Sequence, residues 1–186
     1  MSSKSKIESV AHASVQISGL KSLSFRTLGA EVGVKSSSVH YHFPEKSDLG
    51  EALLKRFRKD LMKTLSEASE QSTTAYESIM CFSQIFIDQC HEGKICFAGM
   101  MAAEVGFLSD ANRDSLNALL DEVHAWLCGE FNRAGDELSV DLPSNALASV
   151  LFSALEGALL IGRSQGSDEY LRSVNALIDS WFGKVN

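Results

Sequence analysis

The longest regular pattern in the sequence is a run of apolar residues that recur every four positions from Leu49 to Leu65. Five basic residues lie among them, between positions 55 and 63. This spacing places the apolar side chains on one face of a helix and leaves the charges in solvent. It predicts one long amphipathic helix, with Ser47 or Asp48 as its N-cap.

Three shorter helical patterns precede this segment. The first is irregular and ends near Gly19. The second follows Ser24, whose hydroxyl can cap it, and stops at Gly33. The third covers about residues 36–42, and Pro44 ends it.

Five further helical patterns follow the long one, and no segment shows the alternation of a strand. They cover approximately residues 79–90, 96–108, 116–131 and 146–162, and the stretch after residue 168. Ser109 or Asp110 is placed to cap the helix at 116–131. The pattern predicts an all-α protein of about nine helices. We expect a three-helix head in residues 1–47, and a helical bundle in residues 48–186 that begins with the long helix.

Composition narrows the class of protein. The chain has 186 residues, of which 45% are hydrophobic and 22% are charged. This excludes a disordered chain and a small disulfide-framed domain. The N-terminus has no apolar signal region, and Glu156 and two serines interrupt the most apolar stretch, residues 146–162, so we expect neither export nor a membrane span. The sequence thus predicts a cytoplasmic protein whose cysteines are reduced.

The net charge of −7 is unevenly distributed. Residues 1–63 hold eleven of the 17 Lys and Arg and six of the 24 Asp and Glu, a net charge of +5. Residues 64–186 hold six basic and eighteen acidic residues, a net charge of −12. Either the charge fluctuates locally, or a basic module for a polyanion is joined to an acidic body.

The segment between residues 24 and 47 favours the second explanation. Its two short helices meet at Gly33, as in a helix-turn-helix, and the second helix is polar enough to enter the major groove of DNA. Val34, Val39 and Phe43 are placed to anchor it to a small core. The alternative is an ordinary helical hairpin with its polar side in water. The residues expected on the DNA-facing surface are Lys35, Ser36, Ser37, Ser38, His40, Tyr41 and His42.

Residues 7–57 resemble the DNA-binding domain of the TetR family of transcriptional regulators. The segment Tyr41-His42-Phe43-Pro44-Glu45-Lys46 matches the aromatic-His-Phe-x-x-Lys signature of that family, and Gly33 matches its turn glycine. The chain length, the helix count and the long linking helix also agree. The resemblance implies a regulator that binds double-stranded operator DNA, most often as a repressor.

The resemblance also implies roles for single residues. Thr27 and Lys46 are expected close to DNA phosphates, and Ser37, Ser38 and Tyr41 are expected to approach bases. At position 40 the family commonly has a tyrosine that donates to a phosphate. A histidine at this position can donate as well, but its charge changes near neutral pH.

A single recognition helix reads only a few base pairs, so we expect a homodimer. The helix at 146–162 is apolar on more than one face, which suits contact with both a core and a partner. In the alternative interpretation the last two helices are core only. The residues expected at the dimer interface are Leu147, Leu151, Leu155, Ala158, Gly162, Val174, Leu177 and Trp181.

The body of the chain is rich in aromatic and methionine side chains. These residues can line a pocket or fill an ordinary core. The family resemblance implies a cavity for a small hydrophobic inducer, with Glu104 and Glu156 as polar anchors, and the acidic body disfavours an anionic inducer. The apolar candidates are Phe82, Phe86, Phe97, Met100, Met101, Trp126 and Phe152.

Cys96 is the one cysteine with a candidate chemical role. It lies at the N-terminus of the predicted sixth helix and follows Lys94 by two residues; both features favour a thiolate. Residues 90–110 resemble a TetR subgroup with a cysteine at this place. Cys96 is thus either a redox or electrophile sensor, or a buried inert thiol. The spacing of the cysteines matches no zinc site.

Two other classes of protein fit the sequence less well. An enzyme would need a nucleophile with a base, a phosphate loop or an HExxH motif, and the sequence has none of these. A helical adaptor that binds only proteins would not need the +5 segment. We therefore expect a non-enzymatic regulator that uses no cofactor and no metal.

Overall fold

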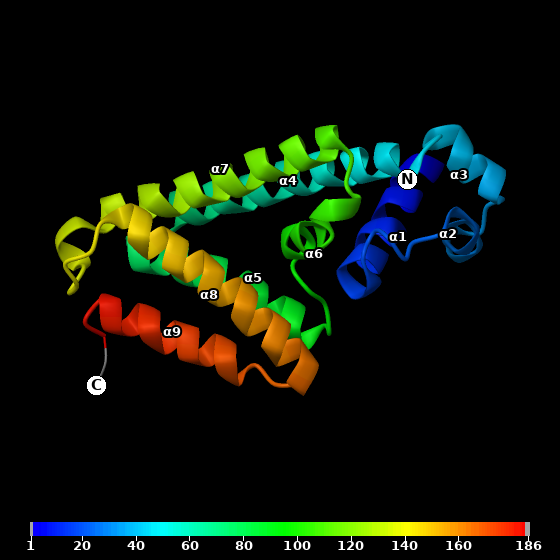
Figure 1. Ribbon diagram of the computed structural model, residues 1–186. Helices are drawn as coiled ribbons and strands as arrows, with labels where there is room; N and C mark the ends of the chain where they lie inside the picture. The colour runs from blue at the N-terminus through cyan, green and yellow to red at the C-terminus, as the bar shows by residue number, and fades with distance from the viewer. Residues whose placement is uncertain (1, 185–186) are drawn as a thin grey trace. The chain divides into compact units, whose positions relative to one another are not determined.

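The computed structural model describes residues 2–184 (Figure 1), and within this range the chain is all helical. Nine α-helices and two short 3₁₀ helices account for its regular structure. This confirms the predicted all-α fold and its helix count. The α-helices are α1 (Ser3–Ser18), α2 (Phe25–Val32), α3 (Ser36–His42), α4 (Lys46–Gln71), α5 (Ala75–His91), α6 (Phe97–Ala103), α7 (Asp110–Ala134), α8 (Ser144–Gln165) and α9 (Glu169–Trp181).

The chain divides into two compact units. Unit 1 comprises residues up to 59 together with 97–119, and unit 2 comprises residues 60–96 together with those from 120 onward. Helices α4 and α7 each contribute to both units. The head expected in residues 1–47 lies wholly in unit 1, which also holds α6. The functional division at residue 47 stays a prediction.

Unit 1 is built on α1, which contacts α2, α3 and α6. The side chains of Ile7, Ala11 and Val15 recur along α1 and are fully buried. Val39 of α3 and Phe43 after it are buried as well, which confirms them as anchors of the polar helix. Val34, the third expected anchor, is only partly buried. Burial of these apolar positions supplies the driving force that holds the short helices in place.

The start of α4 differs from the sequence prediction. The helix begins at Lys46, so neither Ser47 nor Asp48 is its N-cap. The Asp48 carboxylate instead reaches back and accepts the N–H of Glu45 at 2.8 Å. A carboxylate in this position still satisfies one of the unpaired donors at the helix N-terminus.

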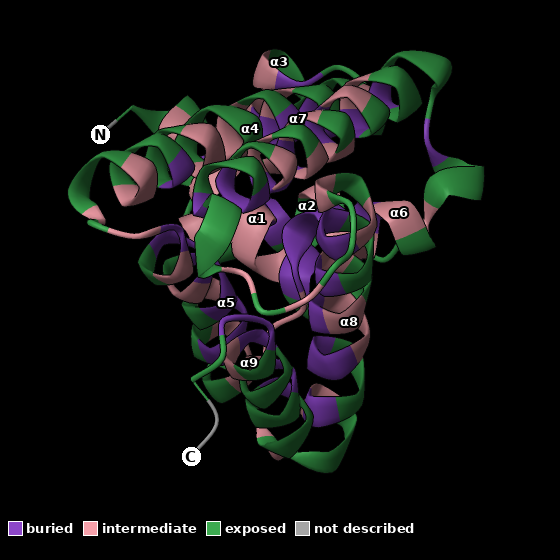
Figure 2. Cartoon of the chain, turned by 90° about the vertical axis from the view of Figure 1, so that its left-hand side faces the viewer, coloured by how far each residue is buried: buried purple, intermediate pink, exposed green. Residues whose placement is uncertain are grey.

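In unit 2, α5, α8 and α9 pack against one another. Helix α8 is buried along one side and exposed along the other (Figure 2). Its length and mean hydropathy of 1.6 would suffice for a membrane span. Core helices pass the same test, and α8 packs within the protein against α5 and α9.

Candidate nucleic-acid interface and sensor core

The helix-turn-helix of unit 1 forms as its sequence predicts. The Ser24 hydroxyl accepts the Thr27 N–H at 3.1 Å and caps α2. Gly33 ends α2 with a φ of 79°, a conformation that glycine adopts without strain. The turn also requires a glycine at position 29, because a Cβ there would lie 2.9 Å from the Val34 carbonyl oxygen. A glycine inside a helix was the signal for this close approach, and the sequence prediction missed it.

Helix α3 presents a continuous polar side to solvent. Lys35, Ser37, His40 and Tyr41 are exposed, and Tyr41 is 83% exposed. A tyrosine presents both an apolar ring and a hydrogen-bonding hydroxyl at such a surface. The remaining candidates on this helix, Ser36, Ser38 and His42, are partly buried.

His40 makes a contact that determines which ring nitrogen carries a proton. Its Nδ1 lies 3.3 Å from the carbonyl oxygen of Pro44, and a carbonyl only accepts hydrogen bonds. Nδ1 therefore donates, and in the neutral ring the other nitrogen, Nε2, has no proton to donate. The ring packs edge-on against Phe25, with 4.8 Å between centroids.

An open cavity of about 450 Å³ brings together the first residues of three helices of unit 1. Ser36, His40 and Lys46 line it, as the sequence led us to expect of neighbouring DNA contacts. It is also lined by Arg26, which the sequence prediction omitted although it directly follows the first residue of α2. Thr27 is exposed near the same end of α2, outside this cavity.

The expected ligand-binding residues are divided between the two units. In unit 2, Phe82 is the centre of an aromatic cluster, with ring centroids 5.2 Å from Phe86, 5.6 Å from Trp126 and 6.1 Å from Phe152. In unit 1, Phe97 stacks on His12, 4.7 Å between centroids. Met100, Met101 and Glu104 belong to unit 1 as well.

Glu156 of α8 is an acid of unit 2 with a perturbed carboxyl group. Burial raises the pKa of its carboxyl, and a hydrogen bond with Cys96 lowers it by less. Its Oε1 is buried without a hydrogen-bond partner. A buried, half-satisfied carboxylate is unfavourable, so this position favours a proton or a cationic ligand.

The surroundings of Cys96 differ from those expected of a reactive thiol. It lies directly before the first residue of α6, one position outside the helix that it was expected to open, and it is only 6% exposed. The Lys94 ammonium is paired with the Glu92 carboxylate. The hydrogen bond to Glu156 also sets a carboxylate beside the sulfur, which works against a thiolate. These contacts favour the buried inert thiol.

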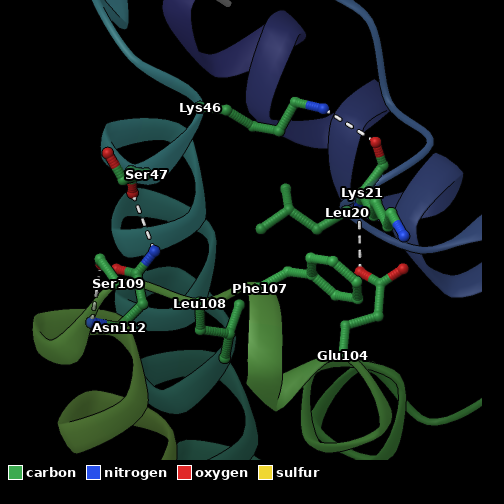
Figure 3. Close-up of a pocket in the computed structure, with 9 residues that line it drawn as sticks. All are labelled: Leu20, Lys21, Lys46, Ser47, Glu104, Phe107, Leu108, Ser109 and Asn112. Carbon is green, nitrogen blue, oxygen red and sulfur yellow. Dashed lines mark hydrogen bonds between the residues drawn. The ribbon is translucent and has the colours of Figure 1, made fainter.

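Glu104 has a structural partner in unit 1. Its carboxylate accepts the backbone N–H of Lys21 at 3.0 Å (Figure 3). This contact lies beside a cavity of about 160 Å³ that Leu20, Phe107 and Leu108 also line. Glu104 is therefore bound to the segment between α1 and α2, a role that the sequence did not indicate.

The expected dimer residues require a correction. The structure buries seven of the eight inside the single chain, which leaves them almost no surface for a partner: Leu147, Leu151, Leu155, Ala158, Gly162, Val174 and Trp181. Leu177 is the exception, with 38% of its surface exposed. The apolar residues that α8 and α9 do expose are Val150, Leu160, Ile161, Tyr170 and Leu177.

A helix-turn-helix unit attached through α4 to a helical bundle defines a class of DNA-binding regulators, and known proteins share this architecture. No family model matches the chain. A TetR transcriptional regulator from Legionella pneumophila is 30% identical, with a TM-score of 0.89 over 96% of each chain. The chain belongs to the TetR family of transcriptional regulators.

More distant relatives share the fold. A TetR-family transcriptional regulator from Agrobacterium tumefaciens is 19% identical, with a TM-score of 0.91 over 97% of each chain. The nucleoid occlusion factor SlmA of Vibrio vulnificus is 22% identical over 157 residues, which cover 82% of this chain and 79% of that protein. The structural matches therefore extend over the bundle as well as the helix-turn-helix unit.

Proposed function

We propose that the protein is a dimeric, sequence-specific DNA-binding repressor that a small hydrophobic ligand releases from its operator. The exposed side of α3 carries this proposal, because it combines hydroxyl, imidazole and phenol groups with Lys35 in a unit whose fold is a helix-turn-helix. Ser37, Ser38 and Tyr41 are assigned to bases, and Thr27, Lys46 and His40 to phosphates. Membership of a family of transcriptional regulators supports the proposal.

Fluorescence anisotropy with duplex DNA from upstream of the protein's own gene tests this function. The protein should prefer that duplex over a scrambled one, and its affinity should fall steeply as salt rises, because phosphate contacts release counterions. Substitution of Tyr41 by alanine should reduce the preference. Equal binding to both duplexes, or no dependence on salt, would contradict the proposal.

We assign dimerisation to the exposed apolar faces of α8 and α9. Val150 and Ile161 lie eleven residues apart on α8, which returns them to the same side of the helix. Both are more than 40% exposed, as is Leu160. Large apolar side chains gathered on one helix face are typical of an interface with another protein.

The proposed inducer binds at the aromatic cluster of Phe82 in unit 2. Glu156 favours an apolar ligand that also carries a positive charge or a hydrogen-bond donor. The variant Trp181→Phe leaves Trp126, a member of the cluster, as the only tryptophan. Its fluorescence should change on titration with hydrophobic amines, and the further change Glu156→Gln should weaken amines more than neutral analogues of the same shape.

The alternative is a regulator that responds only to oxidation or electrophiles at Cys96. Burial of the thiol and the neighbouring Glu156 carboxylate count against it. Intact-mass measurement after mild quinone treatment distinguishes the two. A stoichiometric adduct that Cys96→Ser removes, and that lowers DNA affinity, would favour the alternative.

A further inference from the structure

The backbone of Lys21, in the segment between α1 and α2, is held from two directions within unit 1 (Figure 3). Its N–H donates to the Glu104 carboxylate at 3.0 Å. Its carbonyl oxygen accepts a hydrogen bond from the Lys46 ammonium at 2.9 Å. One residue of a connecting segment thus joins the end of α6 to the first residue of α4.

The side chain of Lys21 makes a third contact with the same region. Its ammonium lies 3.7 Å from the centre of the Phe107 ring, three residues after Glu104. A cation at this distance over an aromatic face is attracted to it. The N–H, the carbonyl and the ammonium of Lys21 therefore each have a separate partner.

Gly19 shows how closely Glu104 approaches the segment. It adopts a φ of 84°, and a Cβ built on it would lie 2.2 Å from the Glu104 Oε1. Only a residue without a side chain allows the carboxylate this near to the backbone. The geometry of the segment is thus matched to the position of Glu104.

The contact with Lys21 leaves Lys46 able to bind an anion. An ammonium has three N–H donors, and the Lys21 carbonyl occupies one. Lys46 is exposed and lines the open cavity that Arg26 and His40 also line. Lys46 also lines the cavity of about 160 Å³ beside Glu104, so it borders both. The Lys21 carbonyl therefore fixes a flexible cation at the edge of the surface where the proposed function places DNA.

We propose that Glu104 is a positioning residue for DNA binding: by holding the Lys21 backbone it fixes the carbonyl that orients the Lys46 ammonium toward a DNA phosphate. This inference rests on the proposed function. In this proposal Glu104 itself does not contact DNA. A shift of α6 would reach Lys46 through two hydrogen bonds.

The sign of the effect makes the inference testable. Removal of a negative charge near DNA should by itself strengthen binding, because fewer like charges repel the phosphates. Loss of the positioning contact should weaken it. The exposed Glu31 of α2 offers the matched control, since Glu31→Gln removes a charge from the same unit without touching Lys21.

Operator affinity and its salt dependence should be measured for the full chain with five variants. We expect Lys46→Met to weaken binding about fivefold and to lower the salt slope by about one, the signature of one lost phosphate contact. Glu104→Ala should weaken binding about threefold or more. Glu104→Gln should bind like the control Glu31→Gln, because its amide oxygen still accepts the Lys21 N–H and only the charge is lost. Glu31→Gln should bind equally or slightly more tightly.

The fifth variant combines Glu104→Ala with Lys46→Met. It distinguishes an effect of Glu104 on the position of Lys46 from a general loss of structure in unit 1. If Glu104 acts through Lys46, the double variant binds no more weakly than Lys46→Met alone. Additive losses, or a Glu104→Ala protein that binds like Glu31→Gln, would overturn the inference while leaving the proposed function intact. If Glu104→Ala does not fold, Glu104→Gln decides. The inference expects this variant to bind operator DNA as tightly as Glu31→Gln does. Weaker binding by Glu104→Gln, with a salt slope equal to that of the wild type, would overturn the inference. A wild-type protein without operator preference overturns both.

Discussion

The two units of this protein differ in net charge and in where their polar side chains lie. Unit 1 has eleven basic and eight acidic residues, a net charge of +3, and it exposes the polar residues of α3. Unit 2 has six basic and sixteen acidic residues, a net charge of −10. The difference follows from their proposed partners, since a polyanion attracts one surface and is repelled by the other.

Inside unit 2, polar groups form a hydrogen-bonded network. Glu130 is only 5% exposed, yet it accepts from Arg133 at 3.0 Å and from Ser69, which in turn accepts from Trp126 at 2.9 Å. Buried acids that are satisfied in this way specify one packing arrangement. Glu156 stands out from them because one of its oxygens has no partner. The contrast between Glu130 and Glu156 is what marks the second as a candidate ligand anchor.

The largest effect should come from the aromatic centre of unit 2. Phe82→Ala removes a side chain that is 2% exposed and should lower the free energy of unfolding by about 3–5 kcal/mol. The control, Phe107→Ala in unit 1, removes a side chain that is 67% exposed and should cost less than about 1 kcal/mol. Urea denaturation followed by circular dichroism measures both. Equal losses would mean that Phe82 is not a core residue.

The second effect concerns the exposed face of α8. Leu160→Glu places a charge on the proposed dimer interface and should raise the dimer dissociation constant on the order of 100-fold. Operator affinity should fall with it, because the two recognition helices are no longer linked. Sedimentation velocity gives the dissociation constant. Leu142→Glu, with similar exposure before α8, should leave the dimer intact; equal dissociation of both variants would refute the assignment.

The third effect is a stabilisation that depends on pH. The folded state raises the pKa of Glu156 above its ordinary value of 4.5, so the folded state holds the proton more tightly. Stability is therefore lost as pH rises from about 4.5 through the raised pKa. Glu156→Gln should stabilise the protein by about 1–3 kcal/mol at pH 7, and the gain should vanish near pH 4. Thermal unfolding across this range tests it, with the exposed Glu137→Gln as a control that should show no such trend.

The smallest effect concerns His40. Its Nδ1 donates to the Pro44 carbonyl and its ring packs edge-on against Phe25, beside the cavity that Arg26 and Lys46 also line. His40→Ala removes both contacts and should weaken operator binding about threefold to fivefold, on the order of 1 kcal/mol. His91→Ala in unit 2 should leave operator affinity unchanged. Fluorescence anisotropy measures both, and equal affinities of the two variants would contradict a role for His40.

Much of the fold could be predicted because its signals are local. The Ser24 hydroxyl and the Gly33 turn define α2 from within ten residues of sequence, and both are confirmed. The start of α4 was misplaced because Lys46 follows Pro44 closely and Asp48 satisfies the helix end from inside. Helix boundaries depend on such backbone hydrogen bonds, which propensity alone does not reveal.

The candidate sites were predicted less completely. Periodicity correctly grouped Leu147, Leu151 and Leu155 on one side of α8, but it does not tell whether that side meets its own chain or a partner. Phe97 was grouped with Phe82 because both are large and apolar, and the fold assigns them to different units. Their shared role in ligand binding stays a prediction. In both cases the pattern identifies apolar residues but does not reveal what those residues contact.

The sequence by itself determined the helical class, the polar side of α3 and the charge asymmetry, because each depends on residues close together in the chain. Only the tertiary structure decided that Glu104 holds the backbone of Lys21, 83 positions away, and that Glu156 lies beside Cys96 with one oxygen unsatisfied. These contacts join segments that are distant in sequence, and packing alone brings such segments together. They turn a recognisable architecture into specific hypotheses about this protein's DNA contacts and ligand.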